Sequence, residues 1–277
     1  MKPVADRLAA LAERGLMQIM VRAAVAGGAE ILDARARGAA LRLKPDASPV
    51  TEADERAERV ILDALAAQFP DVPAVGEEAV SAGQAPAQSG MFFLVDPLDG
   101  TREFVAGRDE FTVNIALVSE GVPVAGVVYV PADGRLWLGD LMTGQPVARA
   151  GVAPACVAAP EVASLAPVGR PALATRSPVA LVSRSHGDPR VEAYLARVGV
   201  TETRPMGSSV KFCLLAEGVA DLYPRFGRTM EWDTAAGDAV LRAAGGVTLD
   251  SAGMPLAYGK AGHENGNFVA WAVAPTA

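Results

Sequence analysis

Two acidic residues in the stretch FFLVDPLDGTREF, residues 92–104, have the type and spacing expected of a site for divalent cations. Asp96 and Asp99 follow a run of apolar residues that predicts a buried strand, and only Pro97 and Leu98 separate them. Two carboxylates about 4 Å apart repel each other by about 4 kcal/mol at an effective dielectric constant of about 20. A positive partner is therefore expected between them, and Mg²⁺ favours carboxylate and carbonyl oxygens. On this motif alone, a surface turn is an equally good explanation.

The residues after this pair predict a tight turn. Pro97 has no backbone N–H, so we expect the strand to end there, and Gly100 and Thr101 then allow the chain to turn. If a helix starts at this point, the backbone N–H groups of Gly100 and Thr101 can hold phosphate oxygens.

Three further acids occupy the boundaries of predicted elements. Asp54 lies in the first turn of a predicted helix, Glu77 lies in a turn-rich segment, and Asp233 opens another helix. Asp54 and Asp233 each have a purely structural explanation, because acids in the first turn complement the helix dipole and cap N–H groups. Together with Asp96 and Asp99 they favour a shared site, since loops at the ends of elements assemble sites in layered folds.

The first half of the chain predicts helices followed by an antiparallel sheet. Residues 5–37 predict a long helix with an interruption near Gly27 and Gly28, and residues 52–68 predict an amphipathic helix capped by Thr51. The segment AVGEEAVSAGQAPAQSG is expected to be a surface loop. FTVNIALVSEGVPVAGVVYV predicts an antiparallel hairpin that turns at its EG pair, and RLWLGD predicts the next strand.

The second half of the chain alternates strands and helices, which predicts an α/β layer. Residues 143–180 are rich in Ala, Pro and Gly and are expected to form irregular strands at a junction. Strands are then predicted at VALVSRSH, ADLYPRF, GVTLD and NFVAWAVA, and helices at residues 188–198, SSVKFCLLAEG and EWDTAAGDAVLRAAGG. We therefore expect an N-terminal α+β domain at residues 1–145 and a C-terminal α/β domain at residues 146–277.

Composition argues against several classes of function. The 277-residue chain is 51% hydrophobic but has no apolar run of about 18 residues, so no stable membrane insertion is expected. A net charge of −7 argues against nucleic-acid binding. Cys156 and Cys213 have no metal-ligand spacing, and His186 and His263 are too few for a multi-histidine zinc site. The N-terminus lacks a signal-peptide pattern, so we expect a cytoplasmic protein, with peripheral association at the inner membrane as an alternative.

Three motifs together, GEE, DPLDGT and EWDTAAGDA, resemble the inositol monophosphatase and fructose-bisphosphatase superfamily of Mg²⁺-dependent, lithium-sensitive phosphatases. The resemblance spans nearly the whole chain. KPDASPVTEAD, GTREF with FTVNIAL, SRSH, and GSSVKFCLLAEGVADLYPRFGRTMEWDTAAGDAV further resemble the bacterial 3'(2'),5'-bisphosphate nucleotidase (CysQ-type) branch. The fold that this resemblance implies is a layered αβαβα sandwich, of mixed α+β and α/β character.

The resemblance also implies two or three Mg²⁺ ions per site. Glu77, Asp96 and the Leu98 carbonyl would hold one ion. Asp96, Asp99 and Asp233 would hold the second, and Glu77 would reach a third through water.

The catalytic residues implied by the resemblance are Asp54, Thr101 and Glu77. Thr101 and Asp54 would orient and deprotonate the water that attacks a phosphate monoester. Two cations about 3.5 to 4 Å apart would activate this water and stabilise the leaving oxygen.

The implied substrate is a small nucleotide, adenosine 3',5'-bisphosphate, whose 3'-phosphate would be removed to give AMP, with its sulfated relative as a further candidate. An inositol monophosphatase is the alternative enzyme, and a phosphate- or metal-binding regulator is the alternative without catalysis. The assembly is left open between a monomer and a homodimer.

Substrate binding is expected to involve the turn after Asp99 and polar residues of the second half. Hydroxyl and cationic side chains in SRSH and GSSVKF, and Arg225, suit a ribose and a second phosphate, although loop polarity or helix capping by Ser208 explains some of them. Arg225 could instead pair with Glu217 or Asp221. The expected substrate-binding residues are Gly100, Thr101, Ser183, His186, Ser208, Lys211 and Arg225, with Arg184 and Ser209 beside them.

Overall fold

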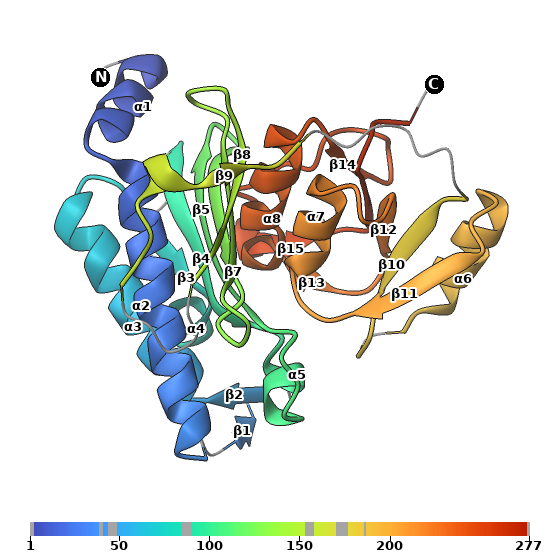
Figure 1. The fold of residues 1–277 in the computed structure, drawn as a ribbon, viewed down its shortest axis with the longest axis horizontal. Coiled ribbons are helices and arrows are strands. Elements are labelled where there is room, and N and C mark those ends of the chain that lie inside the picture. Colours follow the sequence, from blue (N-terminus) through green and yellow to red (C-terminus); the bar gives the residue numbers. More distant parts are fainter. Residues whose placement is uncertain are drawn as a thin grey trace.

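The computed structural model describes residues 3–38, 41–43, 49–84, 90–152, 158–169, 177–185 and 187–275. These residues form five layers (Figure 1). N-terminal helices cover one face of a seven-stranded sheet, two helices fill the space between that sheet and a five-stranded sheet, and one helix covers the far side. The expected αβαβα sandwich is therefore confirmed.

The outer helical layer contains α1 (Val4–Glu13), α2 (Leu16–Ala36) and α3 (Glu52–Gln68). The predicted interruption near Gly27 and Gly28 is wrong, because α2 continues through both residues. The chain instead bends by 62° between α1 and α2, where Gly15 has a φ of 75°. Gly27 and Gly28 instead permit close packing, since a Cβ atom there would lie 2.7 Å from Ile61 and 2.4 Å from Tyr129. The predicted cap is confirmed: Ala53 N–H donates to the Thr51 hydroxyl over 3.1 Å.

Among the described residues, no single helix combines the length and the apolar composition that a membrane span needs. The bent pair α1 and α2 meets the length and composition criteria only when both helices are taken together. Most of α2 packs in the core between the helices and the first sheet.

The first sheet has the strand order β3-β4-β5-β6-β7-β8-β9. The predicted hairpin is confirmed, and Glu120 and Gly121 at its turn both have positive φ angles, 49° and 78°. The bounds are β3 Ala74–Gly76, β4 Met91–Asp99, β5 Thr112–Ser119, β6 Val122–Tyr129, β7 Arg135–Asp140, β8 Gln145–Gly151 and β9 Ala166–Pro167.

Two segments are more regular than their composition suggests. The expected loop after Pro73 begins with β3, which pairs in parallel with β4, and continues as the short helix α4 (Glu77–Ser81). Within residues 143–180, β8 and β9 extend the first sheet, with the short helix η1 (Val162–Ser164) before β9. The change to the second sheet thus falls after residue 167. Division of the chain into domains stays a prediction.

The second sheet has the order β11-β10-β12-β16-β14. Its edge strand β11 was not predicted, because its sequence ETRPM is exposed and has no apolar periodicity. The bounds are β10 Val179–Ser183, β11 Glu202–Met206, β12 Leu222–Arg225, β14 Val247–Asp250 and β16 Phe268–Trp271, with helices α6 Pro189–Arg197, α7 Val210–Ala216 and α8 Glu231–Ala243.

Short elements complete the chain. They are β1 Leu41–Leu43 paired with β2 Pro49–Thr51, β13 Thr229–Met230 paired with β15 Glu264–Asn265, and the helices α5 Thr101–Val105 and η2 Ala261–His263. The second core lies between the two sheets, where α7 and α8 bury apolar residues such as Phe212 and Val240. Because α8 packs against β4, β5 and β6, it carries Asp233 to the end of β4 where Asp96 and Asp99 lie.

Candidate active site

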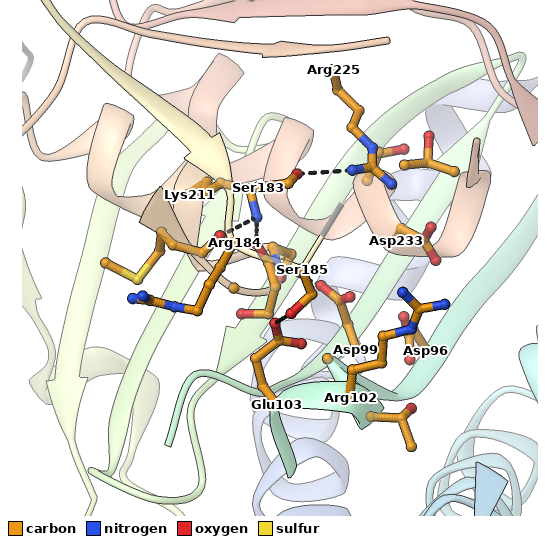
Figure 2. Close-up of a pocket in the computed structure, with 18 of the residues that line it drawn as sticks. Asp96, Asp99, Arg102, Glu103, Ser183, Arg184, Ser185, Lys211, Arg225 and Asp233 are labelled. Atoms are coloured by element: carbon orange, nitrogen blue, oxygen red, sulfur yellow. Dashed lines mark hydrogen bonds between the residues drawn. The ribbon is translucent and has the colours of Figure 1, made fainter. Parts of the chain in front are cut away.

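A pocket of about 200 Å³ opens where the end of β4 meets the first turns of α7 and α8. Asp54 does not line this pocket itself, but it accepts a hydrogen bond from Thr101, which does. His186 lies outside the described residues. The other predicted site residues line the pocket, namely Glu77, Asp96, Leu98, Asp99, Gly100, Thr101, Ser183, Arg184, Ser208, Ser209, Lys211, Arg225 and Asp233. Figure 2 shows Asp96, Asp99 and Asp233 on one side of it, with Arg225 beyond Asp233 and Lys211 on the opposite side near Ser183.

An irregularity in β4 brings Asp96 and Asp99 to the same pocket. Residues three apart in a regular strand point to opposite faces. Here the pairing with β5 shifts between Asp96, opposite Asn114, and Asp99, opposite Thr112. The strand does not end at Pro97 as predicted, because Pro97 lies within this irregular segment, where no ladder hydrogen bond is needed from it.

Each aspartate in the pocket has one oxygen held by a backbone N–H. Leu98 N–H donates to Asp96 Oδ1 over 3.0 Å, Met230 N–H donates to Asp233 Oδ2 over 2.8 Å, and Ser209 N–H donates to Asp99 Oδ2. Within the described ranges, the second oxygen of each aspartate has no hydrogen bond. These three oxygens are thus available to a ligand in the pocket.

Burial, together with the charges of neighbouring acids, raises the pKa values of the three aspartates in the pocket. Burial, followed by the charges of Glu77, Asp99 and Asp233, raises the pKa of Asp96 well above its ordinary value. Burial also raises the pKa of Asp99 to about 6, with Lys211 opposing the shift. The pKa of Asp233 is raised well above its ordinary value by burial and then by Asp99 and Glu77. Negative charge is therefore crowded where Asp96, Asp99 and Asp233 meet, and a bound cation would neutralise it.

The donor set fits a hard divalent cation by its chemistry and its charge, since carboxylate oxygens and the Leu98 carbonyl line one pocket. Within the described part of the chain, however, no three acidic, His or Cys side chains are already arranged closely enough to hold a metal ion. The side chains would have to draw together around one.

Asp54 and Thr101 form a second pair beside the acids. The Thr51 N–H and hydroxyl donate to Asp54 Oδ2 over 2.7 and 2.8 Å, which completes a capping box at the start of α3. The Thr101 hydroxyl lies 3.2 Å from both Asp54 Oδ1 and the Leu98 carbonyl oxygen. Burial raises the pKa of Asp54 to about 6. Asp54 therefore has the expected structural role and also contacts Thr101.

Glu58 positions the segment that carries Glu77 and was missed by the sequence analysis. Its carboxylate accepts hydrogen bonds from the N–H groups of Glu78 and Ala79 over 2.7 and 2.8 Å. Gly76 makes this contact feasible, because a Cβ atom there would lie 2.5 Å from the Glu58 carboxyl carbon. The available signal was its position four residues after Asp54, which places two acids on one helix face.

Lys211 and Arg225 supply buried positive charge to the same pocket, Lys211 near Asp99 and Arg225 near Asp233. Lys211 Nζ donates to the carbonyls of Met206, over 3.3 Å, and Ser208, and burial lowers the pKa of Lys211 to about 8. Arg225 donates to Ser183 Oγ and to the Arg228 carbonyl, each over 2.9 Å. Its Nε is buried, and no partner for it exists among the described residues.

The alternative pairing of Arg225 with Glu217 or Asp221 is wrong. Glu217 instead binds Arg149 at 3.0 Å and accepts from the Trp137 indole over 2.9 Å. Asp221 accepts from the Val179 N–H over 2.7 Å. The Arg225 guanidinium is therefore not neutralised by either acid.

The turn before α7 is fixed by Ser209 rather than capped by Ser208. Ser209 is the residue at the N-cap position, and its hydroxyl bonds Asn114 Oδ1 at 2.6 Å and the Thr112 hydroxyl at 2.9 Å. Ser208, with a φ of 47°, makes only a 3.4 Å contact to the Val210 N–H. Ser209 thus joins the Lys211 turn to the strand beside Asp96 and Asp99.

Arg184 is already paired. Its guanidinium donates to both carboxylate oxygens of Glu110 over 2.9 and 2.6 Å, and Glu110 also accepts from the Gly207 N–H over 2.7 Å. Arg184 therefore ties the loop after β10 to the turn before α7. Glu110 was not identified from the sequence, because its partners are distant in the chain.

Comparison with known proteins finds relatives along most of the chain. The model of the inositol monophosphatase family matches residues 13–275. The 3'(2'),5'-bisphosphate nucleotidase CysQ of Escherichia coli K12 is 42% identical over 223 residues, which cover 78% of this chain and 81% of that protein. The CysQ of Aggregatibacter actinomycetemcomitans is 31% identical over 261 residues, covering 92% and 91%.

A solved structure shows the same fold. The crystal structure of CysQ from Bacteroides thetaiotaomicron, described as a bacterial member of the inositol monophosphatase family, superimposes with a TM-score of 0.78. It is 35% identical to this chain, and the match covers 95% of this chain and 98% of that one.

Proposed function

Because this chain belongs to the inositol monophosphatase family, we propose that it hydrolyses the 3'-phosphate of adenosine 3',5'-bisphosphate to give AMP and inorganic phosphate. The observation that carries the proposal is that one pocket contains both a cluster of acids and two buried cations, Lys211 and Arg225. Lys211 lies close enough to Asp99, and Arg225 close enough to Asp233, to oppose the raised pKa values of these acids. A nucleotide with two phosphates can use the acids, through bound cations, for one phosphate and the two basic side chains for the other.

The acids of the pocket are proposed to bind divalent cations. We propose that Glu77, Asp96 and the Leu98 carbonyl hold one Mg²⁺, and that Asp96, Asp99 and Asp233 hold a second. A third, reached by Glu77 through water, stays a prediction. Bound Mg²⁺ would neutralise phosphate oxygens and lower the pKa of the attacking water. The free aspartate oxygens and the mutual repulsion of these acids support the assignment.

Asp54 and Thr101 are proposed to handle the proton of the attacking water. A carboxylate with a pKa of about 6 is mostly ionised at neutral pH, so Asp54 can accept a proton there. The Thr101 hydroxyl, 3.2 Å from Asp54 Oδ1, lies at the pocket surface and would orient the water. Glu77 is proposed to assist from the acidic side.

The second phosphate is proposed to bind Lys211 and Arg225. Ser183 already accepts a hydrogen bond from Arg225, so it holds the guanidinium in place and adds a hydroxyl. Ser208, Gly100 and Thr101 are further candidates because they line the same pocket. Lys211 and Arg225 are buried and so are poorly hydrated, and they favour a phosphate dianion over the neutral hydroxyls of inositol.

A substrate panel tests the proposal. Phosphate release would be measured with Mg²⁺ from adenosine 3',5'-bisphosphate, its sulfated relative, inositol 1-phosphate and fructose 1,6-bisphosphate. We expect the highest kcat/KM for the adenosine bisphosphate. A preference for inositol 1-phosphate would support the alternative, and binding without turnover of any substrate would support a regulator. The cytoplasmic location and the choice between monomer and homodimer stay predictions.

A further inference from the structure

Glu103 is a buried acid that lines the pocket beside both acidic and basic residues. Its side chain is 3% exposed, yet it is among the residues that line the cavity. It lies close enough to Asp99, Lys211 and Arg184 to influence the pKa values of all three. Glu103 thus lies between an acid proposed to hold a cation and a lysine proposed to hold a phosphate.

The two oxygens of Glu103 have different surroundings. Oε1 accepts a hydrogen bond from the Ser185 hydroxyl, which fixes the carboxylate. Oε2 has no hydrogen bond within the described ranges, and unlike Asn114 Nδ2 it is not sealed from solvent. Figure 2 shows the Glu103 carboxylate beside Ser185, with Asp99 nearby.

Gly207 allows the Glu103 side chain to come this close to the turn before α7. A Cβ atom on Gly207 would lie 2.8 Å from Glu103 Cγ and 2.8 Å from the Glu110 carbonyl oxygen. The carboxylate is therefore anchored by Ser185 at Oε1, in a space that the missing side chain of Gly207 leaves open, and Glu103 lines the pocket with Oε2 unbonded among the described residues. A fixed, buried carboxylate oxygen is an acceptor that requires a donor.

We propose that Glu103 Oε2 accepts a hydrogen bond from the 2'-hydroxyl of the substrate ribose, so that the enzyme prefers ribonucleotides to 2'-deoxyribonucleotides. The proposal rests on the proposed function. In adenosine 3',5'-bisphosphate the 2'-hydroxyl is the one sugar hydroxyl left, on the carbon next to the reacting phosphate. Glu103 neighbours Asp99, one of the acids proposed to hold the cations that would bind the reacting phosphate. A negative acceptor at this position would also repel a misplaced phosphate.

The test compares adenosine 3',5'-bisphosphate with its 2'-deoxy analogue in wild type and Glu103→Gln. The Gln oxygen can still accept from Ser185, while its amide would face the pocket as a donor. We expect wild type to prefer the ribose substrate by about 10- to 100-fold in kcat/KM, the range for a hydrogen bond to a charged group. Glu103→Gln should reduce this preference to about 10-fold or less, because the hydroxyl can still accept from the amide but has lost its charged partner, while activity on the deoxy analogue is retained.

Ser185→Ala is the matched comparison, because it removes the anchor and keeps the negatively charged acceptor. It should lower the ribose preference less than Glu103→Gln does. Equal losses on both substrates in Glu103→Gln, or an unchanged ratio, would overturn the proposal and leave the proposed function intact. A changed preference for adenosine over inosine bisphosphate would likewise overturn it, by assigning Glu103 to the base. If wild type hydrolysed neither adenosine 3',5'-bisphosphate nor its 2'-deoxy analogue, both proposals would be overturned.

Discussion

The Thr101 hydroxyl lies 3.2 Å from Asp54 Oδ1, although 47 positions separate the two residues in the chain. Asp54 reaches this contact from the first turn of α3, where Thr51 donates two hydrogen bonds to its other oxygen. Thr101 begins α5, directly after the acids of β4. The helix cap thus orients a carboxylate toward the residues that surround the pocket.

Asp54→Asn should lower kcat strongly, by about 100- to 10,000-fold, with little change in KM, because a general base is lost while its shape is kept. In wild type, the base must be ionised, so activity should rise with pH through about 6, the pKa to which burial raises Asp54. The pH profile of kcat checks this. Asp63→Asn, a substitution in the same helix but outside the pocket, is the control. A variant with wild-type kcat would contradict the assignment.

Asp99→Asn should be more stable than wild type at pH 7 when Mg²⁺ is chelated. The Asp99 pKa is raised from 3.8 to about 6, so the folded chain binds the proton more tightly than the unfolded chain. Stability from this group is therefore present below pH 4 and is lost as pH rises toward 6, by on the order of 3 kcal/mol. The variant lacks this loss, and Asn still accepts from Ser209 N–H.

The order of stability should reverse with Mg²⁺, which stabilises wild type by binding to its folded state. Thermal denaturation of both proteins at pH 4 and pH 7, with Mg²⁺ and with a chelator, gives all four comparisons. If chelated wild type is the more stable protein at pH 7, the account of repelling buried acids is wrong.

Glu58→Gln should weaken Mg²⁺ binding by about 10-fold without abolishing catalysis, because Glu58 orients the backbone that carries Glu77. Gln offers one acceptor oxygen to two N–H donors. The Mg²⁺ concentration for half-maximal activity should rise, and kcat should recover at high Mg²⁺. Glu55→Gln, on the exposed side of α3, is the control. An unchanged Mg²⁺ requirement would show that Glu58 serves stability alone.

Lys211→Met should reduce kcat/KM for adenosine 3',5'-bisphosphate about 100-fold and leave the rate on adenosine 3'-monophosphate much less affected. Lys211 is buried in the pocket and is proposed to bind the second phosphate, and loss of a charged donor costs about 1.5 to 3 kcal/mol. The ratio of the two substrates separates phosphate binding from a general loss of structure. Arg197→Met, at the exposed end of α6, is the control. An equal loss on both substrates would remove Lys211 from the phosphate site.

Local pattern was enough to predict the elements that position the site. Apolar alternation predicted the hairpin of β5 and β6, and the apolar stripe with Thr51 predicted α3. The acids at element ends were identified because each lies beside a Pro, Gly or cap signal. The layered order of helices and sheets was an implication of the family resemblance.

Contacts between distant segments were not predictable in this way. The irregularity that turns Asp99 to the side of Asp96 depends on pairing with β5, and Pro97 alone indicated a strand end instead. The roles of Glu58 and Glu103 could not be predicted from neighbouring residues, because only the fold brings their partners Ala79 and Ser185 to them. The β11 edge strand carries no apolar signal of its own.

The central claim is that Glu77, Asp96, Asp99 and Asp233 converge on shared divalent cations. Anomalous diffraction from crystals soaked with Mn²⁺ and inorganic phosphate tests it most directly. We predict Mn²⁺ peaks within ligand distance of these carboxylates, with phosphate between them and Thr101, and fewer peaks in Asp99→Asn. Crystals of an active enzyme that show no ion among these four side chains would contradict the account.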